Sequence, residues 1–206
     1  AYLAAVAHEV LADQAHLVIA DAPTMPRSEL AEAKGLAERQ GWNLTVVETA
    51  EFQNEAFIRN DAMRCYHCKA VRFDFMRAYA EQQGIAVVAH GENADDTRDP
   101  TRVGARAAHE RGIAAPLQAA GLTKDEVRQL SRRRGLPPWD KASSACLATR
   151  IPMTTPLDSG DLGKVEQAEE TLKRLGFRQY RVRHHGDLAR LEIEPAEFER
   201  MLRPEV

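Results

Sequence analysis

The stretch LVIADAP, residues 17–23, is a short apolar run that ends in a polar turn with a proline. Its length and composition predict a buried β-strand and the loop that follows it. Pro26 fits the first turn of a helix that continues to about Gln40, where Gly41 provides a stop. The sequence LTVV, residues 44–47, then predicts a second strand. A strand, a helix and a second strand in this order indicate a βαβ unit with a parallel sheet.

The same alternation extends on both sides of this unit. Residues 1–13 and 66–83 have the apolar spacing of helices, and a capping box at Thr123 predicts a helix that continues to Arg134. The sequence IAVVA, residues 85–89, predicts a third strand. Continuous apolar strands are typical of parallel sheets that are covered on both faces. We therefore predict an α/β fold with a parallel sheet.

A different pattern begins after residues 136–160, which are rich in Pro, Ser and Thr and predict a long loop. Residues 162–194 then predict an amphipathic helix followed by two strands with alternating polar and apolar side chains. We therefore expect a parallel-sheet domain over residues 1–155 and a small α+β domain over residues 156–206.

The composition indicates a soluble protein. Hydrophobic residues make up 44% of the 206 residues and charged residues 29%, which suits a chain with a buried core. The formal net charge of -3 does not favour a nucleic-acid-binding surface, and no apolar run reaches the roughly 20 residues of a membrane-spanning helix. The first residues lack the features of a signal peptide, so we expect a cytoplasmic protein. The chain begins inside an expected helix, and we expect further segments at both ends.

Three cysteines form the most informative motif. Cys65 and Cys68 form a C-x-x-C, which occurs in zinc sites, iron–sulfur sites and redox pairs, and Cys146 follows much later in the chain. Structural zinc usually needs four ligands, and a redox pair needs no third cysteine. Three thiolates can instead hold a 4Fe-4S cluster at three of its irons. Simple burial is the plainer alternative, but Arg64 and Lys69 flank the motif, and cationic neighbours favour thiolates.

A polar loop with the sequence HGENADD directly follows the third predicted strand. Ligands of parallel sheets bind beyond the carboxyl ends of the strands, where Gly91 would let the backbone approach a nucleotide closely. Asn93 can hold a nucleotide edge, and Asp95 or Asp96 can bind Mg²⁺. Asp21, at the end of the first strand, would line the same crevice. An ordinary polar loop would have a similar composition, and no G-x-x-x-x-G-K-[ST] phosphate loop is present.

The C-x-x-C, this polar loop, the sequence WDK at residues 139–141 and SACLATRIP at residues 144–152 occur in one order. With them, the chain resembles the LarE family of PP-loop sulfur transferases, which help to make the nickel-pincer nucleotide cofactor of lactate racemase. The resemblance continues to about Glu194 and includes RVRHHGDLAR at residues 181–190. It implies a PP-loop, adenine nucleotide alpha hydrolase-like fold. The S-G-G-x-D-S loop by which family members hold pyrophosphate would fall before Ala1.

The resemblance also implies a reaction. ATP, bound with Mg²⁺, adenylates a carboxylate of a pyridinium biscarboxylate mononucleotide and releases pyrophosphate. Sulfur from sulfide or another donor then displaces AMP and leaves a thiocarboxylate. In some members the cysteine that matches Cys146 gives up its own sulfur. Members with three cysteines look like carriers of a 4Fe-4S cluster, and Cys65, Cys68 and Cys146 place this chain with them.

Five further residues receive roles as expectations. Lys141 would offset charge on the phosphates of the nucleotide. Arg181 and Arg183 alternate along a predicted strand, so both would face one side, and the resemblance implies that they bind the substrate phosphate. Glu169 and Glu192 match acidic positions that look related to the active site in the family. Each of these charges could also belong to an ordinary solvated surface.

The resemblance favours a small-molecule substrate and a homo-oligomer, and it gives no reason to expect a membrane or nucleic-acid partner. Two alternatives remain at this point. A tRNA-thiolating PP-loop enzyme could use three cysteines in the same way, although it needs a basic RNA-binding surface. A non-catalytic module that senses metal or nucleotide would bind its ligand without releasing pyrophosphate.

Overall fold

A parallel pair of strands lies at the centre of the N-terminal part of the protein. Strands β1 (Leu17–Asp21) and β2 (Leu44–Glu48) pair in a register that runs from Leu17 opposite Leu44 to Asp21 opposite Glu48. Helix α2 (Arg27–Gln40) connects them and ends at Gly41, whose φ of 66° is the left-handed conformation that favours glycine. The predicted parallel βαβ arrangement is confirmed. The computed structural model describes residues 1–96, 103–141 and 145–203.

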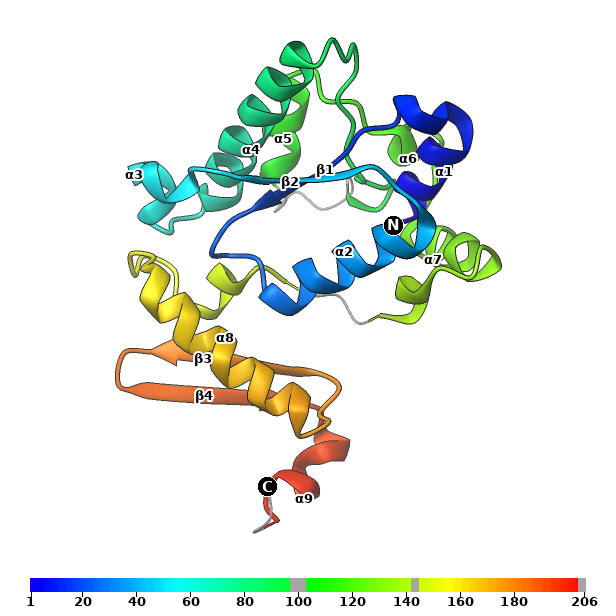
Figure 1. The fold of residues 1–206 in the computed structure, drawn as a ribbon. Helices are drawn as coiled ribbons and strands as arrows, with labels where there is room; N and C mark the ends of the chain where they lie inside the picture. Colours follow the sequence, from blue (N-terminus) through cyan, green and yellow to red (C-terminus); the bar gives the residue numbers. More distant parts are fainter. Residues whose placement is uncertain (97–102, 142–144, 204–206) are drawn as a thin grey trace.

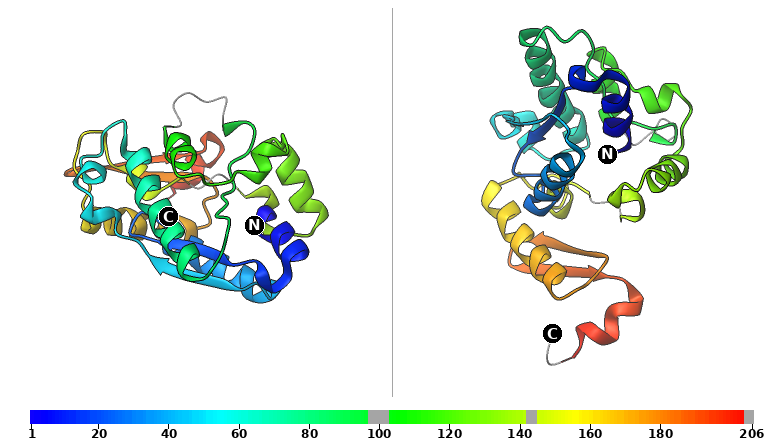
Figure 2. Two further views of the ribbon diagram at one scale, coloured as in Figure 1. Left: turned by 90° about the horizontal axis from the view of Figure 1, so that it is seen from above. Right: turned by 45° about the vertical axis from the view of Figure 1, so that its right-hand side comes forward.

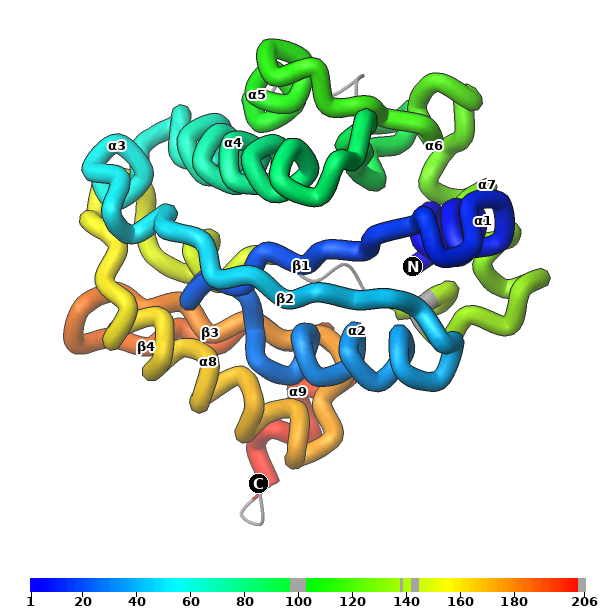
Figure 3. Tube along the Cα trace, turned by 45° about the horizontal axis from the view of Figure 1, so that its top comes forward, coloured from blue at the N-terminus to red at the C-terminus, as the bar shows by residue number. Residues whose placement is uncertain are grey.

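Helices cover both faces of this sheet. Helix α4 (Arg64–Gln82) lies on one side of β1 and β2, and α2 lies on the other (Figures 1 and 3). Helix α5 (Gly104–Glu110) packs on α4, where Phe73 meets Ala108 and Ile113. This layering agrees with the continuous apolar character of the strands.

Shorter elements complete this part of the chain. Helix α7 (Lys124–Arg133) begins at the predicted capping box, in which Thr123 and Glu126 bind each other's backbone N–H groups. The other helices here are α1 (Tyr2–Leu11), η1 (Ala12–Gln14), η2 (Glu51–Gln53), α3 (Glu55–Ile58), α6 (Pro116–Ala119) and η4 (Pro137–Asp140).

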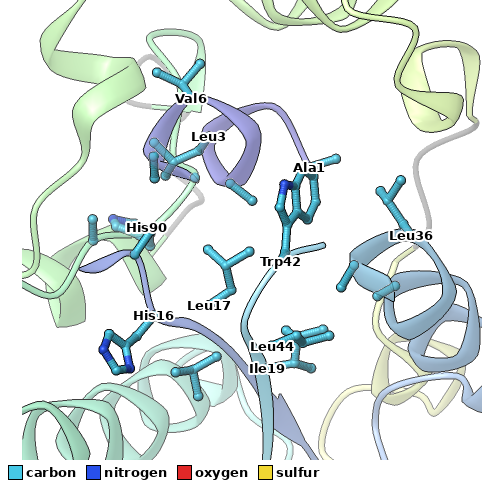
Figure 4. Close-up of a pocket in the computed structure, with 18 of the residues that line it drawn as sticks. Ala1, Leu3, Val6, His16, Leu17, Ile19, Leu36, Trp42, Leu44 and His90 are labelled. Atoms are coloured by element: carbon cyan, nitrogen blue, oxygen red, sulfur yellow. The ribbon is translucent and has the colours of Figure 1, made fainter. Parts of the chain in front are cut away.

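The third predicted strand does not form. Of residues 85–89, only Ala89 makes a β-bridge, with Ala114. Residues 85–89 and β1 both line a largely apolar cavity of about 2260 Å³, which also includes Trp42 and Leu3 (Figure 4). A strand needs a neighbouring edge at about 4.8 Å to complete its hydrogen bonds. The cavity lies between this segment and β1, and the apolar sequence of residues 85–89 forms no ladder with β1.

The C-terminal part consists of a helix on a hairpin. Strands β3 (Tyr180–His185) and β4 (Leu188–Ile193) are antiparallel, with Tyr180 opposite Ile193. Helix α8 (Ser159–Arg174) packs on β3 through a cluster that includes Leu172 and Val182 (Figures 1 and 2). Two short helices, η6 (Pro195–Glu197) and α9 (Phe198–Met201), follow the hairpin.

One core cluster joins the two parts. Phe57 of α3 and Leu147 of η5 (Leu147–Arg150) pack with Leu162 and Val165 of α8, and all four are at most 2% exposed. This cluster crosses the predicted boundary near residue 155, and the division into two domains stays a prediction. Within the described part of the chain, no helix combines the length and apolar character needed to cross a membrane.

Candidate functional site

Two of the three cysteines lie at the start of α4. Cys65 and Cys68 are three residues apart, so their side chains lie on one face of the helix. The N-terminus of a helix carries partial positive charge, which favours thiolates. Cys65 is exposed, whereas Cys68 is partly buried against the core cluster that contains Phe57 and Leu147. The start of α4 therefore presents two thiols that differ in their access to solvent.

The third cysteine lies in the same region. Cys146 is exposed and immediately precedes η5. Burial raises the pKa of Cys68 to about 12; the charge of Arg72 opposes this rise, and the charges of Cys146 and Cys65 add to it. Cys68 packs against the core cluster that contains Leu147, the residue that follows Cys146. The structure thus places the segments of the three predicted thiols in one region of the protein.

The donor set can be compared with the cluster expected from the sequence. Three thiols are soft ligands of the kind that iron–sulfur clusters use, so their chemistry fits. Among residues 1–96, 103–141 and 145–203, however, no group of three His, Cys, Asp or Glu side chains is arranged to hold a metal ion. The chemistry of the donor set fits an iron–sulfur cluster, and the cluster itself stays a prediction.

A buried ion pair lies beside the thiols. Arg72 of α4 forms an ion pair with Glu51, which is fully buried, and donates a hydrogen bond to Thr24 Oγ1 at 3.2 Å. Oε2 of Glu51 has no hydrogen-bond partner within the described residues. Sequence reasoning missed this pair, although Arg72 follows Cys68 by four residues and therefore shares its helix face.

The segment around Cys146, which we call the Cys146 turn (residues 145–150), is anchored by hydrogen bonds. The N–H of Leu147 donates to the Thr24 carbonyl at 2.9 Å, and the Thr149 hydroxyl donates to the Cys146 carbonyl at 2.8 Å. Arg150 is 4% exposed and forms a two-point ion pair with Glu169, at 2.7 and 3.0 Å. Ser144, which belongs to the same motif, lies outside the described residues.

Glu169 is therefore placed inside the structure. Its Oε1 also accepts a hydrogen bond from the N–H of Val182 in β3, at 2.9 Å. Both carboxylate oxygens thus have partners within the protein, and Glu169 ties η5, α8 and β3 together. Its expected role in substrate binding remains a prediction.

A cationic cavity of about 240 Å³ lies next to the Cys146 turn. Arg183 donates two hydrogen bonds to Glu192, at 2.6 and 2.9 Å, and Arg190 donates a third at 2.7 Å. These bonds, those of Arg183 first, lower the pKa of Glu192 to about 2. The Glu192 carboxylate therefore accepts hydrogen bonds from two guanidinium groups. The cavity is lined by Arg64, Thr149, Arg150, Ile151, Pro152, Met153, Arg183, His185 and Arg190.

The two predicted phosphate ligands differ in placement. Arg181 and Arg183 are two residues apart on β3, so both lie on the face expected from strand alternation. Arg183 lines the cationic cavity, whereas Arg181 is exposed and does not. Arg64 and Arg190 complete the cavity, and sequence reasoning assigned a ligand role to neither. Their shared location depends on tertiary packing, although Arg64 directly precedes Cys65.

Lys141 lies on another surface. Its ammonium group pairs with Glu29 at 2.7 Å and with Glu32, which also pairs with Lys173. Burial alone would lower the pKa of Lys141, but the hydrogen bonds that its ammonium group donates to Glu29 and Glu32 outweigh this and raise it. Lys141 remains charged and lines the large apolar cavity.

The residues predicted to hold ATP are only partly brought together. Gly91 lines the large cavity with Lys141, whereas Asp21, Asn93 and Asp96 do not. Asp21 forms an ion pair with Arg27 at 2.6 Å. The N–H of Asn93 donates to Asp96 Oδ2 at 3.1 Å, which folds the polar loop onto itself. Their roles in ATP and Mg²⁺ binding remain predictions.

Comparison with known proteins yields relatives along most of the chain, although no family model matches it. A protein of Synechocystis sp. is 38% identical over 200 residues, which is 97% of this chain and 74% of that protein. The pyridinium-3,5-bisthiocarboxylic acid mononucleotide synthase of Lactiplantibacillus plantarum is 32% identical over 185 residues, 89% of this chain and 66% of the synthase. A protein of Methanocaldococcus jannaschii is 30% identical over 160 residues, 77% of this chain and 60% of its own length. The last two matches span less than two thirds of the relatives' own lengths. The identities over so much of this chain agree with the motifs around the three cysteines, and the similarity to the synthase supports the placement of the protein in the LarE family.

Proposed function

We propose that this protein is an ATP-dependent sulfur transferase. Its substrate is a pyridinium biscarboxylate mononucleotide, and its product is the thiocarboxylate used in nickel-pincer nucleotide cofactor biosynthesis. The name of the Lactiplantibacillus plantarum relative, a pyridinium-3,5-bisthiocarboxylic acid mononucleotide synthase, supports this product class. The observation that supports the proposal is that Cys68, at the start of α4, packs near the segment that follows Cys146, and that Thr149 and Arg150 of this segment line a cationic cavity.

The reaction needs two displacements. A substrate carboxylate oxygen attacks the α-phosphorus of ATP, and pyrophosphate leaves. Sulfide then attacks the carbonyl carbon, and AMP leaves with the electron pair of the broken C–O bond. AMP is a good leaving group only while its charge is offset, which is a role we assign to Lys141.

Residues of the cationic cavity orient the substrate. Arg183 is fixed by Glu192 and presents a planar donor toward the cavity, which suits a phosphate monoester. Arg181 lies on the same strand face and extends this positive surface. Because the cavity adjoins the Cys146 turn, a phosphate bound there places the rest of the mononucleotide near the thiols.

The sulfur carrier in this proposal is a 4Fe-4S cluster held by Cys65, Cys68 and Cys146. Three cysteine ligands leave one iron open, and a small sulfur ligand can bind there when the cluster is present. Arg72 places a positive charge next to Cys68, which offsets negative charge on the thiolates. The nucleotide is assigned to Asp21, Gly91, Asn93 and Asp96, with Mg²⁺ at Asp96.

The test combines iron and acid-labile sulfide analysis of anaerobically prepared protein with a pyrophosphate-release assay. We expect a brown protein that releases pyrophosphate only when mononucleotide and ATP are both present. Cys146→Ala should abolish thiocarboxylate formation and leave pyrophosphate release measurable, because the cysteine acts after adenylation. Equal loss of both activities would contradict the role of Cys146, and colourless protein containing zinc would contradict the cluster.

A further inference from the structure

The carbonyl groups of the Cys146 turn are held by three arginines from different elements. Arg150 donates to the Ala145 carbonyl at 3.3 Å. Arg64, from the start of α4, donates to the Ala148 carbonyl at 3.0 Å, and Arg183, from β3, donates to the Thr149 carbonyl at 3.0 Å. The position of Cys146 is therefore set by contacts that converge on its neighbours in the chain.

Arg64 has a special place among these contacts. It is the first residue of α4 and directly precedes Cys65 in the chain. Its side chain contacts the Cys146 turn through the Ala148 carbonyl, so Arg64 links the segments of two cysteines. The same Nη1 also donates to Asn60 Oδ1. Asn60 is fully buried, and its Nδ2 donates to the carbonyls of Pro152 and Thr155, at 2.8 and 2.9 Å. The side chain of Arg64 is thus held by a buried asparagine that is itself hydrogen-bonded to two backbone carbonyls.

Arg64 also lines the cationic cavity, together with Arg183 and Arg190. Within the described residues, Arg64 has no acidic partner within 4.0 Å, whereas Arg183 and Arg190 share Glu192. The cavity therefore carries excess positive charge. Both hydrogen bonds of Arg64 to the described residues come from Nη1, which leaves Nη2 and Nε as donors for an anion.

We propose that Arg64 is a positioning residue that holds the Cys146 turn against the start of α4 and transmits the filling of the cationic cavity to that turn. An anion bound to Nη2 and Nε fixes the guanidinium plane, and the Nη1 bond to Ala148 then becomes more persistent. The mononucleotide phosphate would in this way steady Cys146 when substrate is present. Only this last statement rests on the proposed function.

Arg190 provides a matched control. It lines the same cavity and carries the same charge, but its hydrogen bond goes to Glu192 and it donates to no carbonyl of the Cys146 turn. Arg64→Met and Arg190→Met therefore remove the same charge from the cavity, and only the first removes a contact with the turn.

The first measurement is the rate of alkylation of Cys146 in metal-free, reduced protein, followed by peptide mass spectrometry with Cys65 as internal reference. Cys146 is already exposed, and loss of a hydrogen bond from a charged donor lets the Cys146 turn sample more orientations of the thiol, so we expect Arg64→Met to raise the alkylation rate about tenfold without added anion. In Arg190→Met, Cys146 should be alkylated at the same rate as in the unchanged protein. Equal rates for Cys146 in Arg64→Met and the unchanged protein would overturn the proposal.

The second measurement adds inorganic phosphate, with chloride at equal ionic strength as control. Phosphate should slow alkylation of Cys146 relative to Cys65 in the unchanged protein and have no such effect in Arg64→Met. Arg64→Lys retains the charge but not the planar donor. This variant should therefore still bind phosphate, but the alkylation of Cys146 should remain as fast as without phosphate. Phosphate protection of the same size in Arg64→Met would show that the anion acts without Arg64.

These measurements need no turnover, so their outcome is independent of sulfur transfer. A protein that lacks sulfur-transfer activity but shows the expected alkylation pattern would retain the positioning role and reject the proposed function. Urea unfolding of each variant verifies that the reactive protein is folded.

Discussion

Glu192 is placed between two arginines, Arg183 and Arg190, and accepts hydrogen bonds from both. These charged donors stabilise its ionised form in the folded protein, which lowers its pKa from the ordinary value of 4.5 to about 2. In return, the carboxylate fixes the guanidinium plane of Arg183 at the edge of the cationic cavity. The shape of the cationic cavity therefore depends on the charge of Glu192.

This arrangement predicts a contribution to acid sensitivity. Because the folded-state pKa is depressed, ionised Glu192 stabilises the fold fully above about pH 4.5, and this contribution is lost as the pH falls toward about 2. Urea unfolding of Glu192→Gln should therefore depend less steeply on pH across this range than that of the unchanged protein. The effect is modest, because the side chain is 33% exposed and partly screened by solvent.

Glu199→Gln is a suitable control, because Glu199 is exposed and has no ion pair among the described residues. It should retain the pH dependence of the unchanged protein. The interpretation of Glu192 would be wrong if both variants gave the same slope.

At the residue scale, sequence reasoning identifies side chains whose chemistry is distinctive. The C-x-x-C points to Cys65 and Cys68 because two thiols at this spacing share a helix face. Arg72 and Glu51 carry no such signal, since their pairing joins η2 to α4 and depends on the packed structure. Glu169 illustrates the converse, because its sequence position suggests a site residue while the fold gives it internal partners.

At the scale of elements, the pair Arg150–Glu169 connects η5 to α8 and, through the Val182 N–H, to β3. Both side chains are nearly removed from solvent. Removal of one partner would leave the other charge buried without compensation, which is costly in a protein interior. The Cys146 turn is thereby fixed to the helix that supports the hairpin.

We expect Glu169→Gln to lower the free energy of unfolding by about 3–5 kcal/mol, because Arg150 would lose its counter-ion. Urea denaturation followed by circular dichroism measures this change. Lys164→Met is the control on the same helix, since Lys164 is 70% exposed in its pair with Asp161 and should contribute little. A loss in Glu169→Gln no larger than in Lys164→Met would refute a buried, stabilising pair.

Element prediction succeeds where local signals are strong. Gly41 ends α2, and Thr123 with Glu126 opens α7, because these residues satisfy the backbone groups at helix ends. It fails at residues 85–89, where the composition favours a strand but ladder formation depends on an adjacent edge that only the tertiary structure can supply. Helices α5 and α6 have 7 and 4 residues, too few for a periodic pattern to identify.

At the scale of the molecule, stability comes from apolar packing. The core cluster of Phe57, Leu147, Leu162 and Val165 packs against Cys68. Burial of such side chains provides a large favourable free energy without any metal. A 4Fe-4S cluster bound by the three cysteines would therefore be added to a fold that the apolar core already stabilises.

We expect removal of iron by a chelator under reducing conditions to bleach the protein and leave its helix content and cooperative thermal unfolding in place. Circular dichroism before and after chelation measures this. Zinc-dependent domains behave differently, because their binding free energy is their folding free energy. Unfolding upon chelation would show that the apolar core is insufficient.

The same core has a consequence for how substrate reaches the thiols. Two lobes joined by a flexible connection can swing apart to admit a ligand, but Leu162 and Val165 of α8 are packed against side chains from the opposite part of the molecule. Such a swing would expose these apolar surfaces to water. We therefore expect entry to proceed through rotations of long side chains at the rim, with the backbone frame remaining closed.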